Sequence, residues 1–129
     1  MYSRPHADRL YSQGRVDGVN GLILLPDNWT TPSSIQFTYQ AGDWSTNSYS
    51  VDDWNVMQSY GAVFLPASGC RYGTGMSNVG SYGFYWSSSY YDNYNNYAYH
   101  LYFYGSDFIA SNYRNRYGGF SVRVVRDVK

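Results

Sequence analysis

The sequence has no glutamate, a single lysine and a single cysteine, Cys70, among its 129 residues. Glutamate and lysine are strong helix formers, so long exposed helices are not expected. One cysteine and two distant histidines, His6 and His100, cannot build a zinc site, and one cysteine cannot form an internal disulfide. These absences favour a strand-and-loop protein without a thiolate–imidazole metal centre.

Charge is also scarce, because nine basic residues balance nine acidic ones and the formal net charge is zero. A nucleic-acid-binding domain usually carries a basic excess, so nucleic acid is not expected as a partner. The longest apolar run, Leu22–Leu25, is far too short to span a bilayer. The polar opening, residues 1–4, does not resemble a signal peptide, so no export signal is expected within this chain.

The length predicts one domain covering residues 1–129, and the aromatic content of 21% argues against disorder. Two segments, Gly21–Pro26 and Gly61–Pro66, each hold four apolar residues followed by proline. Because proline lacks the amide hydrogen that a β-ladder needs, each segment predicts a buried strand that ends there. A strand starting near Arg15 is expected to lead into the first run through a hairpin-type turn at Asn20-Gly21.

Between these strands, residues 52–61 predict one short helix. Asp52 and Asp53 would lie at its positive end, Trp54 and Met57 follow helical spacing, and Gly61 can adopt the left-handed conformation that ends a helix.

Further strands are predicted over residues 35–39, 84–87, 98–104 and 120–126, while the glycine-rich residues 66–83 predict an ordered loop. In the segment 98–104, alternation assigns Tyr99, Leu101 and Phe103 to the core face. The predicted class is therefore an α+β fold, mainly short antiparallel strands with one or two short helices and long ordered loops.

Catalytic signatures are missing around both histidines. Neither His6 nor His100 lies in a nucleophile–base motif, so no catalytic residue is assigned and the protein is not expected to be an enzyme. Calcium needs six or more oxygen ligands, and no loop shows the acidic spacing of an EF-hand. No metal site and no cofactor are predicted.

The most distinctive segment is residues 90–117, where nine tyrosines and five asparagines make up half of the 28 positions. Tyrosine offers a large amphipathic contact surface with few bonds to freeze, and asparagine offers adaptable hydrogen bonds, a mixture typical of antibody paratopes. A buried core cannot absorb so many phenols and amides without leaving polar groups unpaired. The composition therefore predicts a ligand-binding surface.

The genetic code supplies a second observation on the same segment. Asparagine codons changed only at their adenines can reach tyrosine, aspartate, histidine and serine, but never lysine, glutamate, glutamine, tryptophan or methionine. Residues 90–117 contain none of those five. Local compositional drift is the alternative explanation.

Several motifs, in order along the chain, resemble the Fibrobacter succinogenes major paralogous domain, a family abundant in gut bacteria and their phages. The matching segments span about residues 16–126, and they are Gly18–Trp29, Trp54–Met57, Gly61–Ala67, Gly80–Gly83, Tyr85–Ser88, Arg116, Gly119 and Ser121–Arg123. This family is similar to C-type-lectin-fold proteins of the formylglycine-generating-enzyme type. Some members are variable proteins of diversity-generating retroelements, which rewrite a C-terminal region at adenines.

The resemblance implies a C-type lectin-like fold in which Trp86 and residues 119–123 belong to the scaffold. Oxidation of the formylglycine type is not expected, because that chemistry needs two active-site cysteines and only Cys70 is present. The sugar-binding motifs of calcium-dependent lectins are absent, and Trp54-Asn55-Val56 is the nearest match. Family members usually carry further sequence upstream, so the chain is expected to be a C-terminal portion or a minimal version.

We therefore expect a hypervariable ligand- or receptor-binding module that is diversified by a diversity-generating retroelement. Its expected ligand is a protein or glycan on another cell or particle, and the module is expected to be displayed on a phage virion or bacterial cell surface. The alternative is a fixed carbohydrate-binding or adhesive domain whose tyrosines stack on sugar rings. The candidate ligand-binding residues are Tyr90, Asn93, Tyr94, Asn95, Asn96, Tyr97, His100, Tyr104, Asn112, Tyr113, Asn115 and Tyr117.

Overall fold

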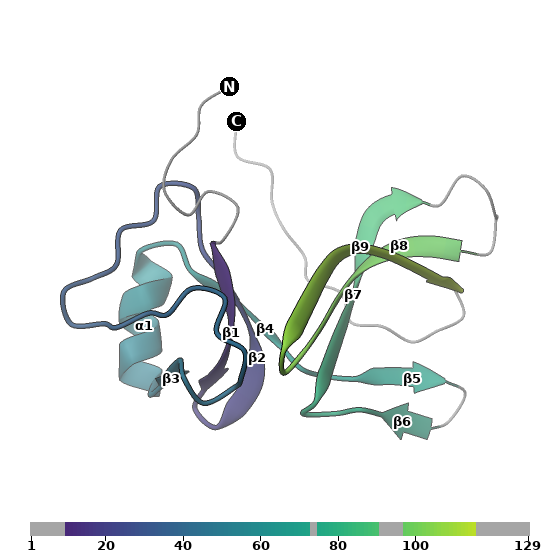
Figure 1. Cartoon of the computed structure of the whole chain (residues 1–129), viewed down its shortest axis with the longest axis horizontal. Coiled ribbons are helices and arrows are strands. Elements are labelled where there is room, and N and C mark those ends of the chain that lie inside the picture. The colour runs from purple at the N-terminus through teal and green to yellow at the C-terminus, as the bar shows by residue number, and fades with distance from the viewer. Residues whose placement is uncertain (1–9, 73–74, 91–96, 116–129) are drawn as a thin grey trace.

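The computed structural model describes residues 10–72, 75–90 and 97–115 of the chain (Figure 1). Within these ranges the protein is a small α+β fold with one short helix and three antiparallel or mixed sheets. A four-stranded sheet lies in the middle, with the helix on one side and a three-stranded sheet on the other (Figure 1). This layering determines which side chains form the core.

The central sheet has the strand order β3-β1-β2-β4. β2 pairs antiparallel with both β1 and β4, whereas β3 pairs parallel with β1. The bounds of its strands are β1 Tyr11–Val16, β2 Val19–Leu24, β3 Ser48–Tyr49 and β4 Val63–Pro66. The two predicted strands before proline are confirmed, since β2 stops before Pro26 and β4 ends at Pro66 itself.

The hairpin turn between β1 and β2 lies at Asp17-Gly18, so the predicted turn at Asn20-Gly21 is wrong. Asp17 and Gly18 have φ values of 50° and 80°, as a type I′ turn requires. Asn20 lies inside β2 opposite Arg15, whose Nε donates to the Asn20 Oδ1 at 2.8 Å. Both dipeptides carry the same turn signal, and pairing of the strands decides between them.

The central sheet is buried on both faces. Leu22 and Ile23 are adjacent in β2, and each is 0% exposed. Ile23 belongs to the core on the helix side with Met57 and Trp29, and Leu22 to the core shared with the three-stranded sheet. Successive residues of a strand face opposite sides, so one strand contributes to two cores.

The predicted helix is confirmed as α1, Val51–Ser59. The Ser50 side chain caps its first turn by accepting from the Asp53 amide at 3.1 Å. Asp52 and Asp53 lie in that turn as expected, and Gly61 follows the helix with a φ of 99°.

Residues 35–39 do not form the predicted strand. Ile35 is buried, and Phe37 and Tyr39 pack partly buried on the same core, so the alternation of burial is real. The Thr38 amide, however, donates to the side chain of Asn47 at 2.9 Å and not to a neighbouring strand. A side chain thus takes the place of a ladder partner.

The glycine-rich segment 66–83 also differs from the prediction of a loop without strands. It contains a short antiparallel hairpin, β5 Cys70–Tyr72 and β6 Gly75–Ser77. Cys70 is buried and forms a small cluster with Phe84. Tyr102, which is partly buried, packs against this cluster.

The three-stranded sheet consists of β7 Tyr82–Tyr90, β8 Tyr97–Tyr104 and β9 Asp107–Asn115. β8 pairs antiparallel with both neighbours. The strands predicted over 84–87 and 98–104 are confirmed, while β9 was not predicted and the segment 120–126 lies outside the described residues. Phe103 and Leu101 face the core as expected, with Phe103 fully buried.

Candidate functional site

The predicted ligand-binding residues fall on the three-stranded sheet wherever the structure describes them. Tyr90 ends β7, and Tyr97, His100 and Tyr104 belong to β8. Three further candidates belong to β9: Asn112, Tyr113 and Asn115. Five candidates lie outside the described residues: Asn93, Tyr94, Asn95, Asn96 and Tyr117.

Register brings six of these seven positions to one end of the sheet. Tyr97 pairs with Asn115, His100 pairs with Asn112, and Tyr90 pairs with Ala98 beside them. Figure 1 shows this end of β7, β8 and β9 pointing away from the central sheet. We call it the distal end.

The six positions divide between the two faces of the sheet. Residues paired directly across an antiparallel ladder share a face, and alternate residues along a strand share it as well. Positions 97, 113 and 115 therefore belong to the face of Phe103, and positions 90, 100 and 112 to the face of Tyr102. The six positions therefore do not share one face of the sheet.

Tyr104 lies apart from the other six, at the opposite end of β8. Its half-buried ring lies 5.5 Å from the Tyr82 ring and 5.6 Å from the Tyr102 ring, centroid to centroid. Phe84 extends the same cluster, with its ring 5.1 Å from that of Tyr102. Tyr104 thus contributes to an aromatic cluster on the face of the sheet opposite Phe103.

The turn between β8 and β9 is fixed to the central sheet by a side chain that the sequence analysis did not single out. Nε2 of Gln13, on β1, donates to the carbonyl oxygen of Tyr104 at 2.9 Å and to that of Asp107 at 2.8 Å. Gln13 is only 3% exposed. In sequence it resembles any polar residue of a half-exposed strand, so no local signal marks this role.

Trp44 provides a second contact at the same turn. Its ring meets the Phe103 ring edge-on, with centroids 6.3 Å apart, and a Cβ on Gly105 would lie 3.3 Å from its Nε1. Through Gln13 and Trp44, two segments distant in sequence hold one end of the β8–β9 hairpin, and the distal end extends beyond it.

The aspartates that the structure describes show no arrangement for a metal. In the ranges 10–72, 75–90 and 97–115, no group of three or more His, Cys, Asp or Glu side chains could hold an ion. Hydrogen bonds from the backbone and hydroxyl of Thr46 and from Ser45 hold the pKa of Asp43 below its usual value.

Among the residues that the structure describes, no helix has the length and apolar character needed to cross a membrane.

Fold and site together define a small α+β protein in which the central sheet holds one end of the tyrosine- and asparagine-rich β8–β9 hairpin. The chain belongs to a domain family of unknown function, DUF8237, whose profile matches residues 40–125. The matched region includes the whole three-stranded sheet. No curated protein and no solved structure matches the chain.

Proposed function

We propose that the protein is a binding module that presents the distal end of the β7–β8–β9 sheet to a ligand. The observation that carries the proposal is the separation along β8 and β9. Gln13 and Trp44 hold the turn end, whereas Tyr97, His100 and their partners on β9 lie at the other end.

The chemistry of the distal residues fits recognition. A tyrosine ring buries a large area on binding, and only two side-chain torsions are fixed when it does so. Asparagine amides can both donate and accept hydrogen bonds, so these residues suit contact with a protein or glycan surface. A scaffold that is ordered before binding lowers the entropy lost when the complex forms. Affinity would come from a few tyrosines, and specificity from which residue occupies each position.

The resemblance noted for the sequence extends this proposal. We infer a C-type lectin-like fold, a non-enzymatic role, and display on a phage virion or bacterial cell, with a ligand on another cell or particle. On the basis of the same resemblance, we propose that a diversity-generating retroelement rewrites residues 90–117. The strand-rich α+β architecture is consistent with this fold.

Sequencing many copies of the encoding locus tests the diversification. We expect differences between copies to concentrate at adenines of asparagine codons within residues 90–117, beside a reverse transcriptase gene and a near-identical template repeat. Differences spread evenly along the gene, or at all four bases, would contradict it.

Tolerance to substitution tests the assignment of the distal end as a binding surface. Because ligand-contacting positions should not hold the fold, His100→Ser and Asn112→Asp are expected to change the free energy of unfolding by less than about 0.5 kcal/mol. The matched core variant Phe103→Leu, on the same strand as His100, is expected to lose about 1–1.5 kcal/mol. If the two distal variants lose as much as the core variant, the distal end is structural and the proposal fails.

A further inference from the structure

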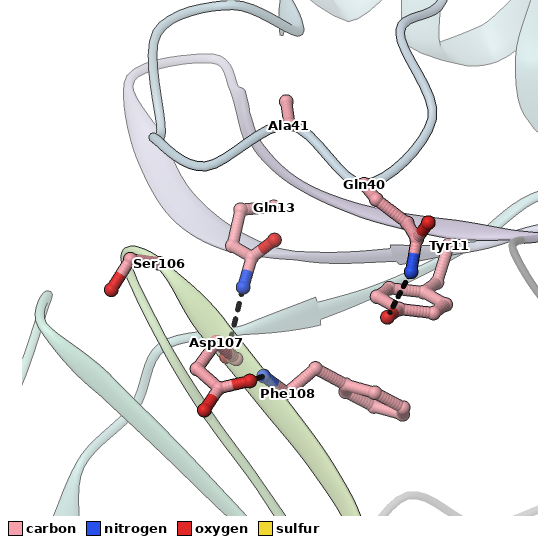
Figure 2. A pocket seen from close by; sticks show the side chains of 7 residues that line it. All are labelled: Tyr11, Gln13, Gln40, Ala41, Ser106, Asp107 and Phe108. Atoms are coloured by element: carbon pink, nitrogen blue, oxygen red, sulfur yellow. Dashed lines mark hydrogen bonds between the residues drawn. The ribbon is translucent and has the colours of Figure 1, made fainter.

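A second candidate site lies at the junction of the two sheets, away from the distal end. It is a pocket of about 280 Å³ built by β1, the segment 40–41 and the start of β9 (Figure 2). Its lining residues are Tyr11, Gln13, Gln40, Ala41, Ser106, Asp107 and Phe108. Three segments far apart in sequence meet there, so only the folded chain forms it.

The side chain of Gln13 is the most informative part of the lining. Its Nε2 is committed to the carbonyl oxygens of Tyr104 and Asp107, while its Oε1 receives no hydrogen bond in the described part of the chain. Figure 2 shows this oxygen on the side of Gln40 and Tyr11, facing the pocket. Gln13 as a residue is 3% exposed, and an amide oxygen that is largely shielded from water and has no donor is costly, because it loses hydration and gains no protein hydrogen bond in return. A ligand that donates a hydrogen bond would satisfy it.

Gln40 and Tyr11 supply the complementary polarity. Gln40 donates from Nε2 to the Tyr11 hydroxyl at 2.7 Å, which leaves the hydroxyl hydrogen of Tyr11 available to a ligand. The backbone of Gln40 has a φ of 52°, a conformation that residues other than glycine seldom adopt, and its amide donates to the Tyr11 carbonyl at 3.0 Å. The pocket thus has an acceptor and a donor on neighbouring walls.

The floor and rim add an aromatic surface and one negative charge. The rings of Tyr11 and Phe108 pack with centroids 4.4 Å apart. Oδ1 of Asp107 accepts from the Phe108 amide at 2.7 Å, and the exposed residues Ser106 and Asp107 complete the lining of the pocket. The aromatic pair offers an apolar surface for C–H groups.

We propose that this pocket binds a neutral, hydroxyl-rich ligand of one ring, such as a single pyranose unit of a glycan. Each hydroxyl of such a ligand can donate to Gln13 Oε1 or to the Asp107 carboxylate and accept from Tyr11, a combination that an ammonium group, which only donates, cannot match. The Asp107 carboxylate disfavours anionic ligands. The volume lies just below the range of about 300–1,000 Å³ of pockets for drug-sized ligands, which suits one ring.

Saturation-transfer NMR with the α- and β-methyl glycosides of glucose, galactose and mannose tests this proposal on the full chain. We expect at least one glycoside to bind. Tyr11→Phe keeps the ring and removes the hydroxyl, and it is expected to weaken the affinity for that glycoside roughly three- to tenfold. Asp107→Asn is expected to weaken it as well. Tyr60→Phe, a hydroxyl deletion at a half-exposed tyrosine that does not line the pocket, should leave binding unchanged. Gln13 is unsuitable for substitution because it also holds the β8–β9 turn.

Three results would each overturn the proposal: no glycoside binds, the bound glycoside is held equally by wild type, Tyr11→Phe and Asp107→Asn, or n-butylammonium binds more tightly than every glycoside. Equal melting temperatures of the variants and the wild type show that the pocket and not the fold has changed. None of the six distal positions lines the pocket, so the outcome does not depend on the binding role proposed for the distal end.

Discussion

Phe103 lies directly opposite Gly83 in the β7–β8 ladder, and its ring covers the place where a side chain at Gly83 would stand. Phe103 is fully buried and joins Leu22, Leu65 and Tyr85 in the core between the sheets. A glycine in a strand interior often marks such a close approach. The pairing joins the three-stranded sheet to the rest of the core.

Gly83→Ala is expected to destabilise the fold, because its Cβ would collide with the Phe103 ring. Overpacking of this kind costs about 1–3 kcal/mol, measured as the free energy of unfolding in urea. Gly42→Ala is the matched control, since nothing lies within 4 Å of a Cβ there. Equal stability of the two variants would contradict the close approach.

Asn47→Ala should destabilise the fold through its lost hydrogen bonds. The Asn47 side chain, 1% exposed, donates to Ser12 Oγ at 2.9 Å and to the Thr38 carbonyl at 2.8 Å, and accepts from the Thr38 amide. Removing it leaves buried partners unsatisfied, so we expect a loss of about 2–3 kcal/mol in chemical denaturation. Asn55→Ala, an exposed helix position, serves as control and should be neutral or slightly stabilising. If Asn47→Ala loses no more stability than Asn55→Ala, the hydrogen bonds of Asn47 do not stabilise the fold and the prediction is wrong.

The loop around Asp43 should respond to acid. Its pKa is lowered first by the backbone and side-chain hydrogen bonds of Thr46, then by Ser45, so the folded loop favours the ionised carboxylate. The stabilisation is therefore complete above the ordinary value of 3.8 and is lost as pH falls below it. Trp44 follows Asp43 and contacts Phe103, so its fluorescence, isolated by comparison with Trp44→Phe, should change in this acid range. The change should disappear in Asp43→Asn and persist in Asp27→Asn; its survival in Asp43→Asn would contradict the assignment.

Tyr49 should make stability sensitive to alkali. Burial, and to a lesser extent the Asp53 carboxylate, raise the pKa of Tyr49 above its ordinary value of 10.0. A raised folded pKa means that the stabilisation is complete below pH 10.0 and falls as pH rises further. Tyr49→Phe should lose about 1 kcal/mol at neutral pH with the 2.6 Å bond to the Gln36 carbonyl, yet decline less steeply in alkali. Tyr60→Phe is the control for an exposed phenol, and parallel declines for all three proteins would refute the prediction.

Local signals sufficed for several elements. Proline after an apolar run fixed where β2 and β4 end, and acidic residues before Trp54 together with Gly61 marked α1. Alternation also assigned Leu101 and Phe103 to the core correctly. Each of these depends on backbone chemistry or periodicity within a few residues.

Other features depended on partners far away in sequence. Asp17-Gly18 and Asn20-Gly21 carry equivalent turn signals, and β9 lies in a tyrosine- and asparagine-rich segment whose composition pointed to a surface and not to a strand. The alternating segment 35–39 lost its predicted ladder because Asn47 bonds to Thr38 instead. None of these outcomes can be read from a window of neighbouring residues.

The amino-acid sequence by itself determined the strand-rich class, the short helix between the two proline-terminated strands, and the concentration of tyrosine and asparagine in one segment. Only tertiary structure decided that this segment forms part of a sheet with a held end and a distal end, and that Gln13 lies buried beside a pocket. The reason is physical: periodicity and turn chemistry act over a few bonds, whereas strand register and the burial of a polar side chain depend on which distant groups satisfy its hydrogen bonds.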